Sequence, residues 1–134
     1  MYRDDRGTVL IVGIATLALA VALTLLAIDV LRLAVRRHEA DLVADSGARA
    51  AVQALDLERY YRGEAARLPL DPAAARSRAL AVVSRPWRVE SVRVRVDAAS
   101  VSVTGDVPLL LGALVGRPTV PVTGSAVAVL RRDP

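Results

Sequence analysis

The sequence predicts an α+β protein in which an N-terminal transmembrane helix continues into a long amphipathic helix, packed on a small three-stranded antiparallel β-meander with one further helix. Three observations lead to this fold class. Residues 8–28 contain no charged side chain. No Gly or Pro interrupts the chain between Leu17 and Asp45. Beyond residue 90, apolar residues recur at every second position, which is the period of a β-strand.

The composition argues against an enzyme. The chain has no Cys and a single His, His38, which follows two Arg residues on a polar stretch of predicted helix. Disulfides, thiolate metal sites and His-rich or Cys-rich metal clusters are therefore excluded. The sequence also lacks a serine nucleophile motif, a spaced carboxylate pair, a GxGxxG pattern and a phosphate-binding loop. We expect no enzyme activity, no cofactor, no metal and no small-molecule substrate.

Residues 8–28 are the predicted membrane span. At about 1.5 Å per residue these 21 residues reach roughly 31 Å, close to the thickness of the hydrocarbon layer. A buried core helix is the first alternative, but the rest of the chain is too small to cover one. A cleaved signal peptide is the second, because Ala18-Leu19-Ala20 resembles a cleavage site, although the apolar segment is longer than such peptides require.

Asp29 follows directly after the apolar span. An ionisable group at membrane depth costs free energy and is often functional. At the end of a span, however, a carboxylate can reach the membrane surface and pair with a base one helical turn further on. We therefore expect a membrane-surface ion pair between Asp29 and Arg32, with an intersubunit contact of Asp29 as the alternative.

The helix is expected to continue beyond the membrane over residues 29–63, with Gly63 as its C-cap. One face of this extension carries small and apolar residues that recur every four positions: Val43, Gly47, Ala51 and Leu55. Small side chains allow another helix or a sheet to approach closely. Two interpretations of this stripe stay open: it packs on the chain's own C-terminal domain, or it makes an intermolecular contact.

The C-terminal domain, residues 64–134, is expected to contain the further helix. Asp71 is a good N-cap and Pro72 suits the first helical position. The chain at Ser84-Arg85-Pro86 should end this helix, because the residue before a proline disfavours the α conformation. The residues expected to face the core are Ala75, Ala79, Val82 and Val83.

Three strands are expected after this helix. In residues 91–97, alternation places Val92, Val94 and Val96 on one face. Residues 100–108 alternate in the same way, and the short connection between the two stretches predicts an antiparallel hairpin. Residues 119–130 form the third strand, in which Pro121 predicts an edge position or a bulge near Gly124, because proline cannot donate to a ladder.

The segment PLLLGALVG is a candidate docking loop. Its exposed side chains are expected to be Leu109, Leu110, Leu111 and Leu114. An apolar surface of this kind often marks a contact with another protein. Internal packing of the segment is the alternative.

One strand face carries a candidate polyanion contact formed by Arg88, Arg93 and Arg95. No aromatic residues are interleaved along it to stack on bases. A solvated basic face is therefore the favoured interpretation, and nucleic acid is not expected as a partner.

Three stretches of the sequence carry a family resemblance. They are the charged start RDDRGTVLIVGIA, the helix DVLRLAVRRHEADLVADSGARAAVQALD with its acid, basic cluster and Ala-rich repeat, and the closing segment DVPLLLGALVGRPTVPVTGSAVAVL. In order and spacing they resemble the TadE/TadG-like, pseudopilin-type minor pilins of tight-adherence (Tad, or Flp) pilus systems, in the form found in actinobacteria. Together they cover most of the chain.

The resemblance implies a pilin-like, membrane-anchored minor pilin or assembly factor, with its N-terminus in the cytoplasm and its C-terminal domain outside. Type IV-like prepilins usually carry a Glu shortly after the processing Gly. If Gly7 were that site, the corresponding residue would be Val12, so an uncleaved, TadG-like anchor fits better than a major pilin.

The distribution of arginines opposes this orientation. Arg3 and Arg6 precede the span, whereas Arg32, Arg36 and Arg37 follow it. Because basic residues gather on the cytoplasmic side, this count alone places the C-terminal domain in the cytoplasm. The charge count and the resemblance therefore predict opposite orientations.

We expect a single-pass protein of the cytoplasmic (inner) membrane with four parts: a cytoplasmic tail (1–7), a transmembrane helix (8–28), a helical extension (29–63) and an extracytoplasmic α+β domain (64–134). The expected function is a structural or assembly component of a Tad pilus or related secretion apparatus. Its expected partners are the membrane and other pilin-like and assembly-platform proteins. The alternatives are a pseudopilin-like component of a DNA-uptake machine, or a membrane-anchored cell-envelope binding module unrelated to pili.

Overall fold

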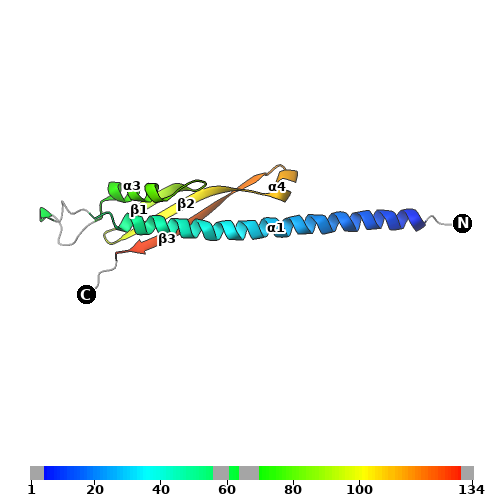
Figure 1. Ribbon diagram of the computed structural model, residues 1–134, viewed down its shortest axis with the longest axis horizontal. Helices are drawn as coiled ribbons and strands as arrows, with labels where there is room; N and C mark the ends of the chain where they lie inside the picture. Colours follow the sequence, from blue (N-terminus) through cyan, green and yellow to red (C-terminus); the bar gives the residue numbers. More distant parts are fainter. Residues whose placement is uncertain (1–4, 56–60, 64–69, 131–134) are drawn as a thin grey trace.

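The computed structural model describes residues 5–55, 61–63 and 70–130. One long helix, α1 (Asp5–Val52), carries a three-stranded antiparallel sheet along its C-terminal half, and its N-terminal half projects beyond the sheet (Figure 1). This arrangement confirms the predicted α+β fold class. The predicted tail at residues 1–7, the last part of the predicted extension (56–60) and the domain start at Glu64 lie wholly or partly outside the described residues.

The long helix ends earlier than the sequence predicts. It stops at Val52, so the prediction of one helix continuing to Gly63 is wrong. The two residues that follow the helix give their carbonyl oxygens to partners in the next part of the chain. The Arg78 guanidinium donates to the carbonyl oxygen of Gln53 at 3.0 Å, and the Asp71 N–H donates to that of Ala54 at 2.9 Å. These bonds hold the chain in a turn that leaves the helix axis.

The sheet consists of β1 (Arg88–Val94), β2 (Ala98–Pro108) and β3 (Thr119–Val129), in the order β1-β2-β3. Both pairings are antiparallel, as the meander prediction requires. Pro121 therefore lies on an edge strand of the described sheet, which is the first of the two positions expected for it. The register irregularity falls between Val89 and Ser91 of β1, not near Gly124.

One strand prediction is wrong at its end. Val92 and Val94 face the core, but Val96 is exposed. The Arg95 N–H donates to the Ala98 carbonyl oxygen at 2.7 Å, which closes the hairpin at this point. Val96 therefore lies in the turn, where alternation no longer sets which face a side chain occupies.

Helix α3 (Pro72–Val82) packs on α1 and β1. The Asp71 side chain accepts a hydrogen bond from the Ala73 N–H at 2.9 Å, which confirms the predicted N-cap. The buried residues of this helix are Ala75 and Ala79, and Val83 packs partly buried against the core. Val82 is exposed, so its predicted core position is wrong.

The core lies between the C-terminal half of α1 and the inner face of the sheet. The helix contributes four alanines with no exposed surface: Ala40, Ala44, Ala48 and Ala51. Val101 and Val103 of β2 are the largest fully buried side chains among the described residues. At Gly124 the backbone of β3 touches the backbone of α1, because a Cβ placed there would lie 2.3 Å from the carbonyl carbon of Ala40.

Replacing Gly124 with Ala should destabilise the domain. The added methyl group meets backbone atoms that cannot rotate away, so we expect the free energy of unfolding to fall by about 3 kcal/mol. The fluorescence of Trp87 reports unfolding in detergent, because Trp87 is the only Trp of the chain and is buried. Gly13→Ala is the control, since a Cβ there meets no atom within 4 Å. Equal stability of the two variants would contradict the close approach.

Candidate functional site at the anchor junction

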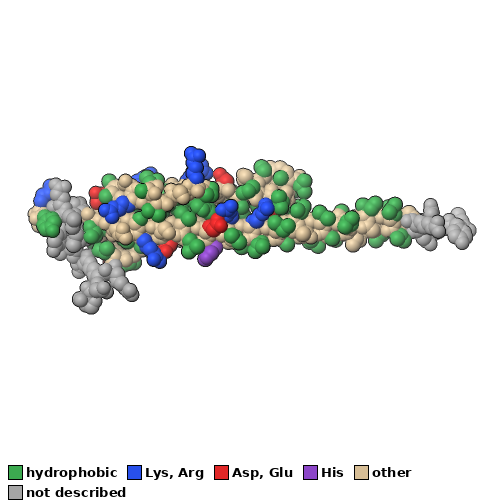
Figure 2. All heavy atoms as spheres, in the orientation of Figure 1, with side chains coloured by type: hydrophobic (Ala, Val, Ile, Leu, Met, Phe, Trp, Pro, Cys, Tyr) green, Lys and Arg blue, Asp and Glu red, His purple; other side chains and the backbone are tan. Residues whose placement is uncertain are grey.

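The projecting part of α1 is an apolar surface without a protein cover. Every side chain from residue 8 to residue 28 is exposed except those of Ala22 and Leu25, which are half-buried. Figure 2 shows the charged side chains gathered on the half of the molecule that carries the sheet. This part of the helix is long and apolar enough to cross a membrane.

Two hydroxyl groups within the apolar segment are bonded inside the helix. Thr16 Oγ1 donates to the Val12 carbonyl oxygen at 2.8 Å, and Thr24 Oγ1 donates to that of Ala20 at 2.9 Å. In lipid there is no water to take these bonds, so polar groups must be satisfied within the protein. The segment meets that requirement at both threonines.

Asp29 marks the point where the domain joins the projecting helix. Its side chain belongs to a residue only 5% exposed, the only buried charged residue among those described. Oδ1 accepts a hydrogen bond from the Leu110 N–H at 2.8 Å, and Oδ2 accepts one from the Leu111 N–H at 2.7 Å. Hydrogen bonds to an ionised acceptor are roughly twice as strong as those between neutral groups.

The two donors begin α4 (Leu110–Leu114), a short helix in the connection between β2 and β3. Its own N-cap residue, Leu109, has no side-chain hydrogen bond to the first free N–H groups. Asp29 therefore supplies from α1 the cap that the local sequence lacks. A helix start without a Ser, Thr, Asp or Asn before it was the available sequence signal that the cap comes from elsewhere.

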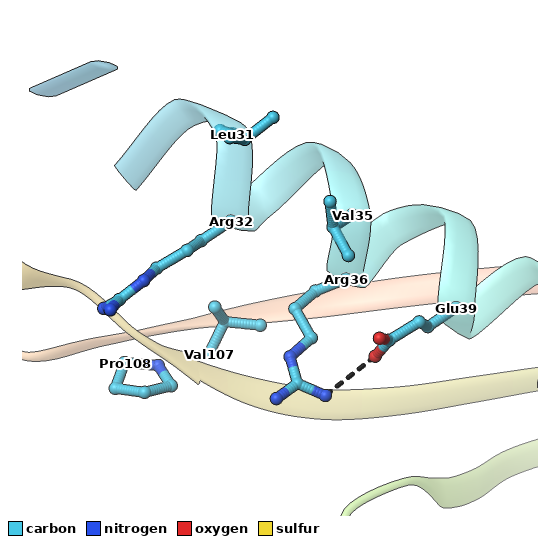
Figure 3. A pocket seen from close by; sticks show the side chains of 7 residues that line it. All are labelled: Leu31, Arg32, Val35, Arg36, Glu39, Val107 and Pro108. Atoms are coloured by element: carbon cyan, nitrogen blue, oxygen red, sulfur yellow. Dashed lines mark hydrogen bonds and ion pairs between the residues drawn. The ribbon is translucent and has the colours of Figure 1, made fainter. Parts of the chain in front are cut away.

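The expected ion pair between Asp29 and Arg32 does not form among the described residues. Both oxygens of the carboxylate point to α4, whereas Arg32 points into a neighbouring groove (Figure 3). The ion pairs described near this groove instead include Arg36 with Glu39, joined at 2.7 Å. The groove has a volume of about 510 Å³, and its lining residues are Leu31, Arg32, Val35, Arg36, Glu39, Val107 and Pro108.

The predicted helix stripe faces the chain's own sheet. Gly47 and Ala51 are buried and Val43 is partly buried, as the intramolecular interpretation expects. A Cβ on Gly47 would lie 3.3 Å from Cγ1 of Val101, so the sheet occupies the approach that the small residue allows. Leu55 lies beyond the end of α1 and is exposed, in a bridge with Leu70.

A different stripe of α1 is exposed. Leu31, Val35 and Leu42 lie at positions i, i+4 and i+11, on the side of the helix away from Gly47. Their spacing was visible in the sequence, but two apolar stripes on one helix do not indicate which is buried. The structure leaves this outer stripe open to a partner.

The predicted docking loop is partly packed inside the protein and partly exposed, so each of the two alternatives holds for some of its residues. Leu109 and Leu111 are partly buried, whereas Leu110 and Leu114 are exposed. The Leu109 N–H donates to the Pro118 carbonyl oxygen at 2.8 Å, which closes the loop at its base. The segment thus has an inner side and an exposed apolar side. We call α4 (Leu110–Leu114) together with Val115 the tip.

The three strand arginines lie at or next to the open face of the sheet. Arg88 is partly engaged, because its guanidinium contacts Asp106 at 3.3 Å. Arg93 and Arg95 line a shallow hollow of about 250 Å³ together with Ala98, Ser100 and Val127. His38 is exposed on α1, and the described residues contain no group of three or more His, Cys, Asp or Glu that could hold a metal ion.

Comparison with known proteins gives no match: no family model, no curated protein and no solved structure matches this chain. The site therefore rests on its own geometry. It combines an uncovered apolar helix, a buried carboxylate that caps a second element, and an apolar tip beside the helix.

Replacing Asp29 with Ala should release α4. Loss of two charge-assisted hydrogen bonds, partly offset by the removed cost of burying a carboxylate, should weaken this contact by about 2 kcal/mol. We expect amide hydrogen exchange at Leu110 and Leu111 to accelerate about thirtyfold, measured by NMR in micelles. Asp41→Ala, an exposed acid on the same helix, is the matched control. Unchanged exchange at both amides would show that Asp29 does not hold α4.

Proposed function

We propose that this protein is a membrane-anchored, non-enzymatic structural or assembly component of a Tad-type pilus or related secretion apparatus. The observation that carries the proposal is the continuity of α1. One unbroken helix of 48 residues is uncovered and apolar at its N-terminal end and forms the core of the β domain at its C-terminal end. At 1.5 Å per residue it is about 72 Å long.

This continuity supports a mechanical role. A helix without a break transmits position and orientation from the membrane to the domain, because a sharp kink in it requires disrupting its hydrogen bonds. The domain is held to the helix along one face of its sheet and again at Asp29. A continuous helix of this kind suits a subunit that must hold its domain at a fixed distance from the membrane.

The proposed contacts with other pilin-like or platform proteins use the outer stripe of α1. Leu31, Val35 and Leu42 form an apolar line just beyond the proposed membrane span. Another helix that leaves the same membrane in parallel would meet this line, with apolar side chains facing each other as in bundles of helices. The proposed protein–protein contact is therefore lateral.

A DNA-uptake component remains the second candidate. Arg93 and Arg95 line the same hollow on the sheet, and both are exposed. Arg88, which would be the third phosphate contact, is partly neutralised by Asp106. Two arginines without stacking aromatics on the described face supply a weak polyanion site, so we place this candidate below the pilus component.

The orientation of the anchor decides where the proposed contacts occur. Fused after Pro134, alkaline phosphatase should be active and green fluorescent protein dark, because the proposal places the domain outside the cytoplasm. Alkaline phosphatase needs an oxidising compartment to fold, so the two reporters give opposite signals. A fluorescent, phosphatase-inactive fusion would place the domain in the cytoplasm, as the arginine distribution predicts, and would contradict a pilus role.

The lateral contact is tested by a triple variant, Leu31→Gln, Val35→Gln and Leu42→Gln. These side chains are exposed, so the fold should keep its stability while the apolar line is lost. We expect the crosslinked partners recovered from the host membrane to be lost. Val127→Gln with Val129→Gln, on the open sheet face, is the control and should leave them unchanged. Loss in the control alone would move the contact to the sheet.

A further inference from the structure

The tip of α4 lies beside the part of α1 that is proposed to be in the membrane. Leu111 and Leu114 line an apolar groove of about 410 Å³ together with a row of residues from α1: Ile14, Leu17, Ala18, Val21, Ala22 and Leu25. Every residue in that row precedes Asp29 in the chain. The tip therefore extends from the junction toward the membrane, alongside the apolar helix, and not away from it.

The exposed side chains of the tip are apolar. Leu114 is 74% exposed and Val115 is 73% exposed. The neighbouring surface of α1 is apolar and exposed as well, so the two elements form one continuous apolar surface. A bilayer that surrounds residues 8–28 has to surround this tip too, because both occupy the same level along the helix axis.

Several backbone groups of the tip have partners inside the protein, which favours a position in lipid. The N–H groups of Leu110 and Leu111 are taken by the Asp29 carboxylate, and the Leu109 N–H is taken by Pro118. At the other end, the Gly112 carbonyl oxygen accepts from the N–H groups of Val115, at 3.2 Å, and Arg117, at 2.8 Å. Irregular backbone is tolerated at membrane depth only where such internal partners exist.

Two arginines lie close to the tip: Arg32 on α1, and Arg117, which is exposed two residues after Val115. Arg32 lies one helical turn beyond Asp29, and its side chain extends along the groove toward Pro108 (Figure 3). None of the described ion pairs includes it. A long basic side chain at this level can reach lipid phosphate while its stem stays on the apolar surface.

We infer that α4 and Val115 form a second membrane contact, in which the tip lies in the lipid leaflet that faces the β domain and acyl chains fill its groove with α1. The inference rests on the proposed membrane anchor and deepens it. Asp29 then sets the depth of the domain, because it ties the tip to the helix at the edge of the hydrocarbon layer. Apolar elements held in this interfacial region bind through the apolar area that they bury.

The absence of native Cys makes the inference testable with single thiols. Full-length Leu114→Cys is labelled with bimane and reconstituted in vesicles of phosphatidylcholine and phosphatidylglycerol. Brominated acyl chains should quench the label, and iodide in the water should not. Val115→Cys should behave in the same way, which guards against a local effect of one substitution.

Two further variants separate this inference from the proposed anchor. Leu19→Cys, in the projecting helix, should be quenched by brominated lipid, and Ser102→Cys, on β2, by iodide alone. If Leu19→Cys is quenched by lipid but Leu114→Cys only by iodide, the inference is overturned and the anchor stands. If Leu19→Cys is reached by iodide and not by lipid, the anchor fails and the inference falls with it.

If a second copy of the protein covers the tip in place of lipid, quenching and crosslinking give a different result. A label at position 114 shielded from both quenchers, together with disulfide-linked dimers of unlabelled Leu114→Cys, would show a second copy on the tip. That result overturns the lipid contact. Labels quenched by lipid, without such dimers, support it.

Discussion

The close packing of α1 against the sheet is the contact on which the rest of the structure depends. The helix meets the sheet with alanines and Gly47, and at Gly124 the two backbones touch. Small side chains permit this approach, and each added contact contributes dispersion energy that a looser interface would lose. A chain with only 3% aromatic residues and no disulfide gains a stable core in this way, by bringing backbones together instead of filling the space with large side chains.

The same packing gives one helix two roles. Its C-terminal half completes the domain core, so the domain is not linked to the apolar half by a flexible connection. Any force or displacement at the apolar end reaches the sheet through continuous helical hydrogen bonds. In the proposed function this rigidity replaces a linker.

Asp29 adds a second attachment at the boundary. A buried carboxylate is costly unless hydrogen bonds satisfy it, and here both oxygens accept backbone N–H groups. The bonds serve both elements, because α4 has no cap of its own. A charge at the edge of the apolar segment is thereby kept without a counter-ion, and Arg32 is left for the groove beside it.

Local patterns in the sequence determined the apolar span, the N-cap at Asp71 and the period-two strands, since each depends on residues close together in the chain. The tertiary structure alone decided the partner of Asp29, whose donors are backbone groups 81 and 82 residues away. The sequence shows at most that the start of α4 lacks a capping residue of its own; it does not show which distant side chain supplies the cap. The tertiary structure also decided that Gly47 is buried and Leu42 is exposed. It decided as well that α1 ends at Val52, next to Gln53, whose carbonyl oxygen accepts a hydrogen bond from Arg78 of another helix. These outcomes depend on which surfaces meet, and that is settled only when the whole chain packs.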